Sequence, residues 1–157
     1  MKKILLLTFI GLFSSSCNQM SMQQENTEQD EEIEVLKEKV NDGVFIHISE
    51  AYDDPHRVLM PLKMAVLMAE DKNVLVYMDI DAVNLLVKGA EDLNFNGFDS
   101  FQTYIKQLLD KNVGVYACPS CLNVAGYTPD DLMAGIDVAQ KEKFFNFTEG
   151  RIITLDY

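Results

Sequence analysis

Basic residues are scarce in this sequence. Its 157 residues include 13 Lys and Arg against 25 Asp and Glu, which gives a formal net charge of -12. A surface of this sign repels nucleic acid, and no basic patch along the chain reverses it. We therefore exclude nucleic acid as a partner.

Glycine and proline are also few, with 8 and 4 residues, whereas 48% of the residues are apolar. This composition excludes a collagen-like or low-complexity chain and predicts a globular fold with a real core. The length suits one domain and little more, and no internal repeat is visible.

Long apolar runs are absent except at the start of the chain. The run at residues 4–13 follows Lys2 and Lys3, and it is too short to span a bilayer comfortably. Small serines at 14–16 and then Cys17 complete a layout typical of a secretory signal peptide over residues 1–16. It resembles a bacterial lipoprotein signal with Cys17 as the lipidated residue, although Ser14 stands where leucine is usual. An ordinary cleaved signal followed by a chance cysteine is the alternative.

A polar segment separates this signal from the rest of the chain. Residues 18–34 are rich in Gln, Asn, Glu and Asp, so they cannot bury enough apolar surface to order themselves. We expect residues 17–42 to hold the lipid attachment and an acidic flexible tether, and residues 43–157 to form the domain. The protein would then be an exported, membrane-anchored lipoprotein that faces the periplasm or the cell exterior.

Short apolar strands alternate with helical patterns through the expected domain. Because Pro61 is tolerated only in a first helical turn, the first helix is expected to begin near 58–60. The alternation predicts an α/β domain with a parallel sheet covered by helices on both faces. The expected strands are 44–49, 73–79, 113–117, 136–139 and 151–157, and the expected helical segments are 58–71, 80–89, 99–112, 128–135 and 140–150.

Cysteine is rare, with three residues in all, and two of them lie close together in the stretch ACPSC. If Cys17 carries lipid, Cys118 and Cys121 are the remaining thiols. Cys118 ends the third predicted strand, where reactive groups of parallel sheets gather. Pro119 suits the first position of a helix, so Cys118 would cap that helix, whose amino end stabilises a thiolate. Cys121 would lie one turn later on the same face.

Several roles for this Cys-X-X-Cys pair stay open. A thioredoxin-like redox pair normally follows an early strand, not the third one. A zinc site needs four ligands, and the only histidines are His47 and His56, so a two-thiolate copper(I) site is the simpler metal hypothesis. A structural disulfide is possible outside the cytoplasm, but so short a loop yields little stability.

Three polar residues follow the second predicted strand, at 79, 81 and 84. Asp79, Asp81 and Asn84 could face the same crevice as Cys118. The interpretation we favour is that these three residues are solvated loop residues and a helix cap.

The stretch GVYACPSCLNVAGYTPDDLMAGIDV resembles the cysteine-bearing segment of the DsrE/DsrF-like proteins. In that family a strand of the form Gly-Val-X-Val ends at a cysteine. A glycine follows eight residues later, then a short acidic helix and a short strand. Here these elements are Cys118, Gly126, residues 130–132 and residues 136–138. The resemblance extends over about residues 43–157.

The resemblance implies a small α/β domain with a mostly parallel five-stranded sheet, assembled into a homo-oligomeric trimer or hexamer. Its best-known members relay sulfur as a cysteine persulfide, and Cys118 matches the acceptor cysteine. Cys121 has no counterpart in those members, although other branches carry a second cysteine there. The best-known members are also cytoplasmic, so the lipoprotein signal is a second departure.

We therefore expect a thiol or sulfur transfer protein outside the cytoplasm. Cys118 would be the reactive thiol and Cys121 the second sulfur, with a persulfide or disulfide intermediate, no cofactor, and an unidentified sulfur or thiol partner protein. The alternative is a module that binds a small ligand or soft metal, or an oligomeric scaffold without chemistry.

Overall fold

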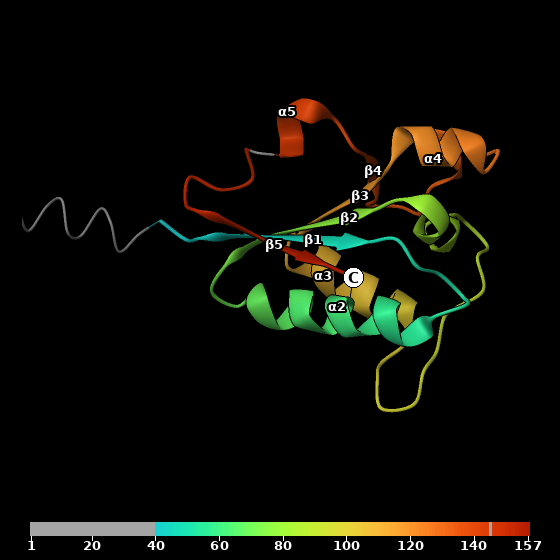
Figure 1. Ribbon diagram of the computed structural model, residues 1–157, viewed down its shortest axis with the longest axis horizontal. Helices are drawn as coiled ribbons and strands as arrows, with labels where there is room; N and C mark the ends of the chain where they lie inside the picture. Colours follow the sequence, from blue (N-terminus) through green and yellow to red (C-terminus); the bar gives the residue numbers. More distant parts are fainter. Residues whose placement is uncertain (1–39, 145) are drawn as a thin grey trace, which may run out of the picture. The chain divides into compact units, whose positions relative to one another are not determined.

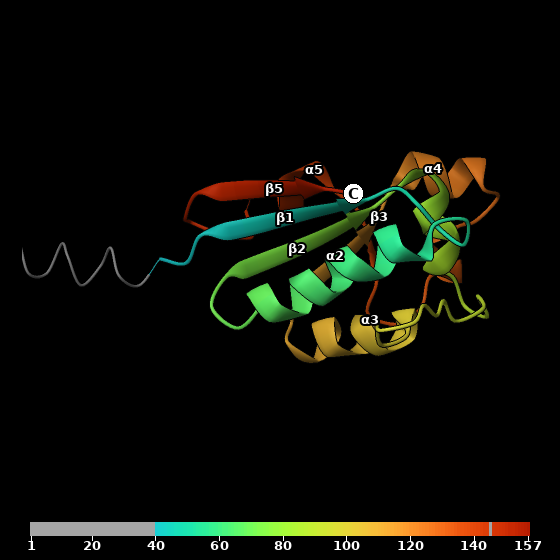
Figure 2. The ribbon, with the colours of Figure 1, turned by 60° about the horizontal axis from the view of Figure 1, so that its bottom comes forward.

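Five parallel strands form the centre of the computed structural model, which describes residues 40–144 and 146–157. All paired strands run parallel, in the order β4-β3-β2-β1-β5, and Figure 2 shows β5, β1 and β2 side by side. This confirms the predicted α/β fold. The strands are β1 (Gly43–Ile48), β2 (Asn73–Met78), β3 (Gly114–Ala117), β4 (Asp137–Val138) and β5 (Ile152–Asp156).

The signal peptide expected at 1–16, Cys17 and the tether up to residue 39 lie outside the described residues. Within the described part of the chain, no helix is both long enough and apolar enough to cross a membrane. Membrane attachment through Cys17 therefore stays a prediction.

One face of the sheet carries the main core. Helices α2 (Pro55–Met68) and α3 (Phe101–Asp110) cover this face together, as Figure 1 shows. Alternate strand residues point into it, because successive side chains of a strand lie on opposite faces. These buried residues are Val44, Ile46, Ile48, Val74, Val76, Met78, Val115 and Ala117.

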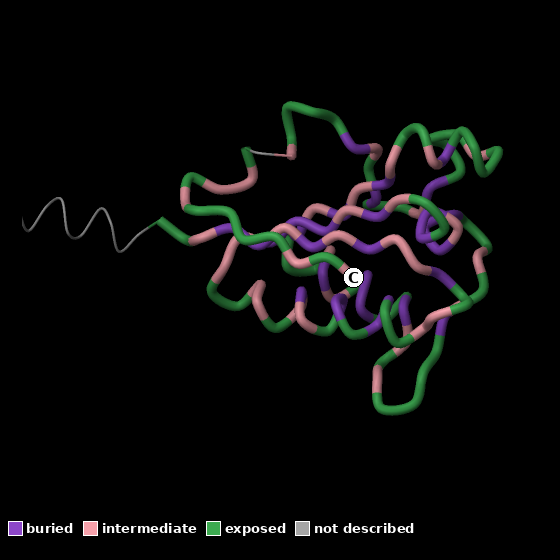
Figure 3. The backbone as a smooth tube through the Cα atoms, viewed as in Figure 1, coloured by how far each residue is buried: buried purple, intermediate pink, exposed green. Residues whose placement is uncertain are grey.

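The opposite face is aromatic and more thinly covered. Phe45, Tyr77 and Tyr116 are half-buried there and surround Phe144 of the short helix α5 (Lys141–Phe144). The Phe144 ring centroid lies 4.9 Å from that of Tyr77 and 5.7 Å from that of Phe45. Helix α4 (Pro119–Val124) lies beyond the strand ends, and most of edge strand β5 is exposed (Figure 3).

Helix α2 begins earlier than the sequence predicted. It starts at Pro55, so Pro61 lies inside the helix and not in its first turn. Asp54 caps the helix, because its Oδ1 accepts a hydrogen bond of 3.2 Å from the Arg57 backbone N–H. Pro61 is itself buried on the core side, and this packing offsets the backbone hydrogen bond that proline cannot donate.

The helix predicted over residues 128–135 is wrong. The chain makes only the 3-10 turn η2 (Pro129–Asp131), although Thr128 and Asp131 form the expected capping box. Leu132 is extended and pairs with Val87 in an antiparallel bridge. Two backbone hydrogen bonds of 2.8 and 2.9 Å accompany this bridge, and they take the place of further helical bonds. The segment predicted as helical over 80–89 is likewise a 3-10 helix, η1 (Ile80–Leu85).

Candidate functional site

Cys118 lies where strand β3 meets helix α4. Its backbone N–H donates a 2.9 Å hydrogen bond to the Met78 carbonyl of β2, which fixes it at the end of the sheet. It is the N-cap of α4, with Pro119 at the first helical position, as the sequence predicted. Its Sγ accepts a hydrogen bond of 3.4 Å from the Cys121 backbone N–H.

A row of polar and aromatic side chains crosses the sheet close to Cys118. Asp156, His47, Tyr77 and Tyr116 are successive register partners on β5, β1, β2 and β3. Because they share one register row, their side chains point to the same face, away from α2 and α3. The pairing therefore brings the Tyr77 hydroxyl to Cys118, two positions beyond Tyr116.

The surroundings of Cys118 favour its thiolate. Burial opposes the charged form, but hydrogen bonds from the Tyr77 hydroxyl and from Cys121 outweigh it and lower the pKa of Cys118. Burial and the same contact with Cys118 raise the pKa of Tyr77, so this hydroxyl keeps its proton and acts as a donor. No Lys, Arg or His lies close to Cys118 in the sequence to stabilise its thiolate, and the fold places the Tyr77 phenol there instead.

The two thiols, both free, differ in protonation. Burial and the hydrogen bond with Cys118 raise the pKa of Cys121, while a hydrogen bond from the Ile80 backbone acts in the opposite direction. The arrangement therefore places the negative charge on Cys118 in preference to Cys121 when the pair loses its first proton. Such a pair provides a nucleophile and a second sulfur one helical turn away.

Ile80 has a strained backbone next to this pair. Its φ angle is 45°, in the left-handed region that a β-branched residue rarely adopts. The conformation places the Ile80 backbone at the Cys121 sulfur and leaves the Ile80 side chain 60% exposed. Strain of this kind concentrates at functional sites, because surrounding contacts must hold it in place.

His47 links three strand ends behind Tyr77. Its Nδ1 lies 2.8 Å from Asp156 Oδ1, and its Nε2 lies 2.8 Å from Asp79 Oδ1. Burial opposes the charged ring, but these two carboxylates outweigh it and raise the pKa of His47. Since both ring nitrogens donate only in the imidazolium, the geometry fits a protonated His47. Its ring stacks on Tyr77 at a centroid distance of 5.6 Å and so fixes that side chain.

A cavity of about 400 Å³ opens beside Cys121, between η1 and α4. Asp81 and Asn84 line it together with Cys121, but Cys118, the cysteine whose crevice they were predicted to face, is not among the lining residues. Asp79 does not line it, because it turns to His47. The full lining is Ile80, Asp81, Asn84, Ser120, Cys121, Val124 and Ala125.

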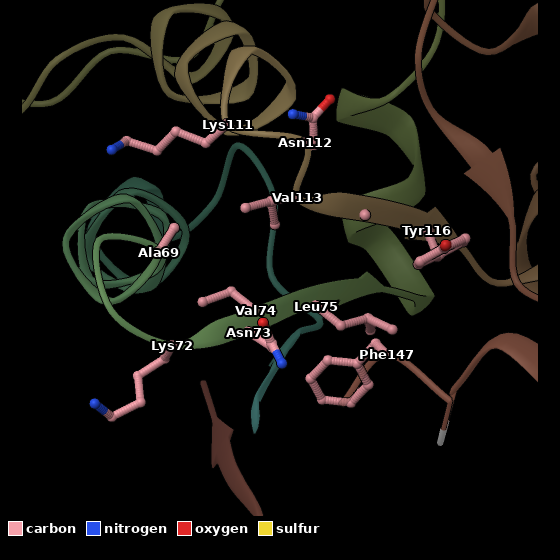
Figure 4. A pocket seen from close by; sticks show the side chains of 11 residues that line it. Ala69, Lys72, Asn73, Val74, Leu75, Lys111, Asn112, Val113, Tyr116 and Phe147 are labelled. Atoms are coloured by element: carbon pink, nitrogen blue, oxygen red, sulfur yellow. The ribbon is translucent and has the colours of Figure 1, made fainter. Parts of the chain in front are cut away.

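A second cavity, of about 340 Å³, lies at the opposite ends of β2 and β3 (Figure 4). Lys72 and Lys111 border it, but their side chains point away from Tyr116 and Phe147 on its other side. Lys72 also pairs with Asp71 at 2.6 Å. This cavity therefore has no converging set of reactive groups.

Metal ligands do not converge in the part of the chain that the structure describes. None of its His, Cys, Asp and Glu side chains form a group of three or more suited to a metal ion. His56 lies in α2 and stacks on Phe95 at a centroid distance of 5.3 Å, and it is not placed beside the thiols.

The sequence and the fold match a known family. A model described as the DsrE/DsrF-like family matches residues 42–150. The protein belongs to this family. Among solved structures, the ychN protein from E. coli has a TM-score of 0.58 at 18% identity, covering 73% of this chain and 99% of that chain. MTH1491 from Methanobacterium thermoautotrophicum, titled a protein of unknown function, has a TM-score of 0.53 at 25% identity, covering 73% and 100%. No curated protein matches the sequence.

Sequence reasoning placed the two thiols of this DsrE/DsrF-like protein together but missed their neighbours. Tyr77 and His47 were read as ordinary residues of buried strands. In the sequence, Tyr77 and His47 are recognisable only as polar groups near the carboxyl ends of strands. Which residues they contact depends on the register between the strands. Register between parallel strands is set by tertiary packing, so a single sequence does not reveal that Tyr77 reaches Cys118.

Proposed function

We propose that this DsrE/DsrF-like protein transfers thiol or sulfur groups through Cys118, with Cys121 as the second thiol. The observation that supports it most is the environment of the Cys118 sulfur. It accepts a hydrogen bond of 3.4 Å from the Cys121 backbone N–H, and the nearby Tyr77 hydroxyl lowers the pKa of Cys118. Both interactions strengthen when the sulfur is negative, so they favour the nucleophilic form. The family supports a sulfur-relay type of fold.

The proposed chemistry begins with a persulfide donor, R–S–SH. The Cys118 thiolate attacks the outer sulfur, so a new S–S bond forms at Cys118 and the donor S–S bond breaks. The bonding pair leaves with the donor as R–S⁻, and Cys118 becomes a persulfide. An acceptor thiolate then takes the outer sulfur and restores the Cys118 thiolate.

Cys121 offers a second outcome for the same intermediate. After losing its proton, its thiolate attacks the inner sulfur of the Cys118 persulfide. A Cys118–Cys121 disulfide forms and hydrosulfide leaves, so the donated sulfur is reduced and the two thiols are oxidised. Proximity within one helical turn favours this reaction, and Cys121 would then limit the lifetime of the persulfide.

We also propose the cellular setting inferred from the sequence. The protein would be exported, anchored through lipid on Cys17, and would receive sulfur or thiol groups from a partner protein. A homo-oligomer would fit the exposed apolar side chains of edge strand β5, where Ile152 is 39% and Ile153 is 53% exposed. Light scattering of the purified protein tests this assembly, which should have the mass of a trimer or hexamer.

Mass spectrometry after incubation with a small alkyl persulfide, whose organic group carries no charge, tests the transfer. We expect one added sulfur atom on the peptide that contains Cys118 in the wild type and none in Cys118→Ser. In Cys121→Ser the persulfide should accumulate and persist, because the thiol that resolves it is gone.

Asn123→Ala is the matched control, since it changes an exposed residue of the same helix outside the cavity lining and keeps both thiols. It should retain sulfur loading. Loading of Cys118→Ser to the wild-type level, on any residue, would rule out Cys118 as the acceptor.

A further inference from the structure

The cavity beside Cys121 lies against the proposed reaction centre and has its own chemical character. We propose that it binds the organic group of a small sulfur compound when that group is uncharged and apolar, and that it disfavours donors whose organic group is anionic. This inference rests on the proposed function of Cys118 and names its substrate class.

The rim of the cavity is apolar. Val124 is 87% exposed and Ile80 is 60% exposed, and both line it together with Ala125. Covering large exposed apolar side chains with an apolar group removes apolar surface from water, which lowers the free energy. The volume of about 400 Å³ is that of a small-molecule site, and an organic group there would cover both side chains.

The charge around the cavity has one sign. None of the seven lining residues is basic, and Asp81 supplies a carboxylate to the wall. Asp79 acts electrostatically on the Cys121 thiol, and His47 does not offset this charge alone, because it lies between two carboxylates, Asp79 and Asp156. The whole chain carries a net charge of -12. An anionic donor would therefore be repelled both on approach and in the bound position.

The wall that contains Cys121 joins this cavity to the reaction. A disulfide or persulfide bond whose organic group fills the cavity would lie against α4, where Cys118 is one turn from Cys121. For a diaryl disulfide, the Cys118 thiolate attacks one sulfur, a mixed disulfide forms and one aryl thiolate leaves. The Cys121 thiolate then displaces the second aryl thiolate and closes the Cys118–Cys121 disulfide.

Two diaryl disulfides of different charge test the proposal on the full chain. One is 4,4′-dithiodipyridine, which is uncharged at neutral pH, and the other is 5,5′-dithiobis(2-nitrobenzoate), which carries two carboxylates. Stopped-flow absorbance follows the released aryl thiolate, and peptide mass spectrometry assigns the modified cysteine. The neutral-to-anionic rate ratio at Cys118 is compared with the same ratio for the urea-unfolded chain, which removes the intrinsic reactivity of each probe.

We expect the folded protein to exceed the unfolded ratio by about tenfold at low salt, and by less at high salt. Asp81→Asn should lower the neutral-to-anionic rate ratio at Cys118, because it removes the carboxylate of the cavity wall. Val124→Ser should slow the neutral probe about threefold, whereas Val40→Ser, an exposed valine distant in sequence, is the matched control and should not.

The outcomes separate the inference from the proposed function. If Cys118 reacts quickly with both probes but their ratio equals that of the unfolded chain, the inference is wrong and the nucleophile stands. If Cys118 reacts no faster than in the unfolded chain with either probe, both are overturned. Equal effects of Val124→Ser and Val40→Ser would also overturn the binding role of the cavity.

Discussion

At the residue scale, the candidate site depends on a few hydrogen bonds around one sulfur. The Tyr77 hydroxyl reaches Cys118 from the neighbouring strand, and the Cys121 backbone reaches it from α4. His47 stacks behind Tyr77 and is held by Asp79 and Asp156. The contacts of Tyr77 and His47 cross between strands and depend on the sheet register, whereas the Cys121 contact is local to the start of α4.

Tyr77→Phe removes the hydroxyl that stabilises the Cys118 thiolate. A hydrogen bond from the Tyr77 hydroxyl favours the charged form of the sulfur, so we expect the pKa of Cys118 to rise in this variant. The rate of alkylation by iodoacetamide at neutral pH should fall severalfold. Tyr116→Phe is the control, because Tyr116 occupies the same register row but is not among the groups that lower the pKa of Cys118. Equal rates for the two variants would show that Tyr77 has no special role.

His47 makes stability depend on pH. Its pKa is raised in the folded protein, so its contribution is fully present below the unfolded value of about 6.5 and is lost as pH rises through the folded value. Urea unfolding from pH 6 to 9 should show the free energy of unfolding of the wild type falling relative to His47→Gln. A constant difference between the two proteins across this range would contradict a protonated His47.

At the element scale, the short segments η1 and α4 form the site, while the long helices only support it. Helices α2 and α3 build the core on one face, and the thiols lie at the strand ends beyond it. The strained Ile80 begins η1 and directs its backbone to Cys121.

The difference between local and long-range contacts explains which features the sequence could predict and which it could not. Apolar periodicity revealed the strands, helix α3 and the capping role of Cys118, because local residue types decide these features. The start of α2 and the loss of a helix after Thr128 were decided by the Asp54 cap and by the pairing of Leu132 with Val87. The Tyr77–Cys118 contact depended on strand register, which is not local information.

Ile80→Asn tests whether the Ile80 backbone of η1 is strained and whether the site needs the isoleucine side chain at this position. Asparagine tolerates the left-handed conformation, so we expect the free energy of unfolding to rise by about 1 kcal/mol. The neutral diaryl disulfide should at the same time react more slowly, because the apolar rim is lost. Ile153→Asn, at an exposed isoleucine of strand β5, should instead lower stability. A loss of stability in both variants, measured by urea unfolding, would contradict strain at Ile80.

At the scale of the whole molecule, the proposal places an acidic DsrE/DsrF-like domain at a membrane surface. We expect the net charge of -12 on the whole chain to favour solubility and to disfavour nucleic acid as a partner. Lipid on Cys17 would hold it there and leave Cys118 and Cys121 as the chemically available thiols.

Cys17→Ser should move the protein from the membrane fraction to the soluble fraction of a bacterial host. The proposed lipid is attached to the Cys17 sulfur, so the variant cannot carry it. Stable anchoring of a soluble domain needs two lipid chains, or one chain and a second membrane signal, and the variant lacks this anchor. Cys118→Ser and Cys121→Ser are matched controls and should stay in the membrane fraction. If residues 1–16 are cleaved from the wild-type protein and the product is found in the soluble fraction, the segment is an ordinary signal peptide.

The most direct measurement for the central claim is the pH dependence of Cys118 alkylation in the wild-type protein. The rate constant for iodoacetamide, assigned to Cys118 by peptide mass spectrometry, follows the thiolate fraction. We expect its midpoint clearly below the ordinary thiol value of about 8.5, with Cys121 titrating above it. A Cys118 midpoint at or above about 8.5 would contradict a nucleophilic thiolate at this site.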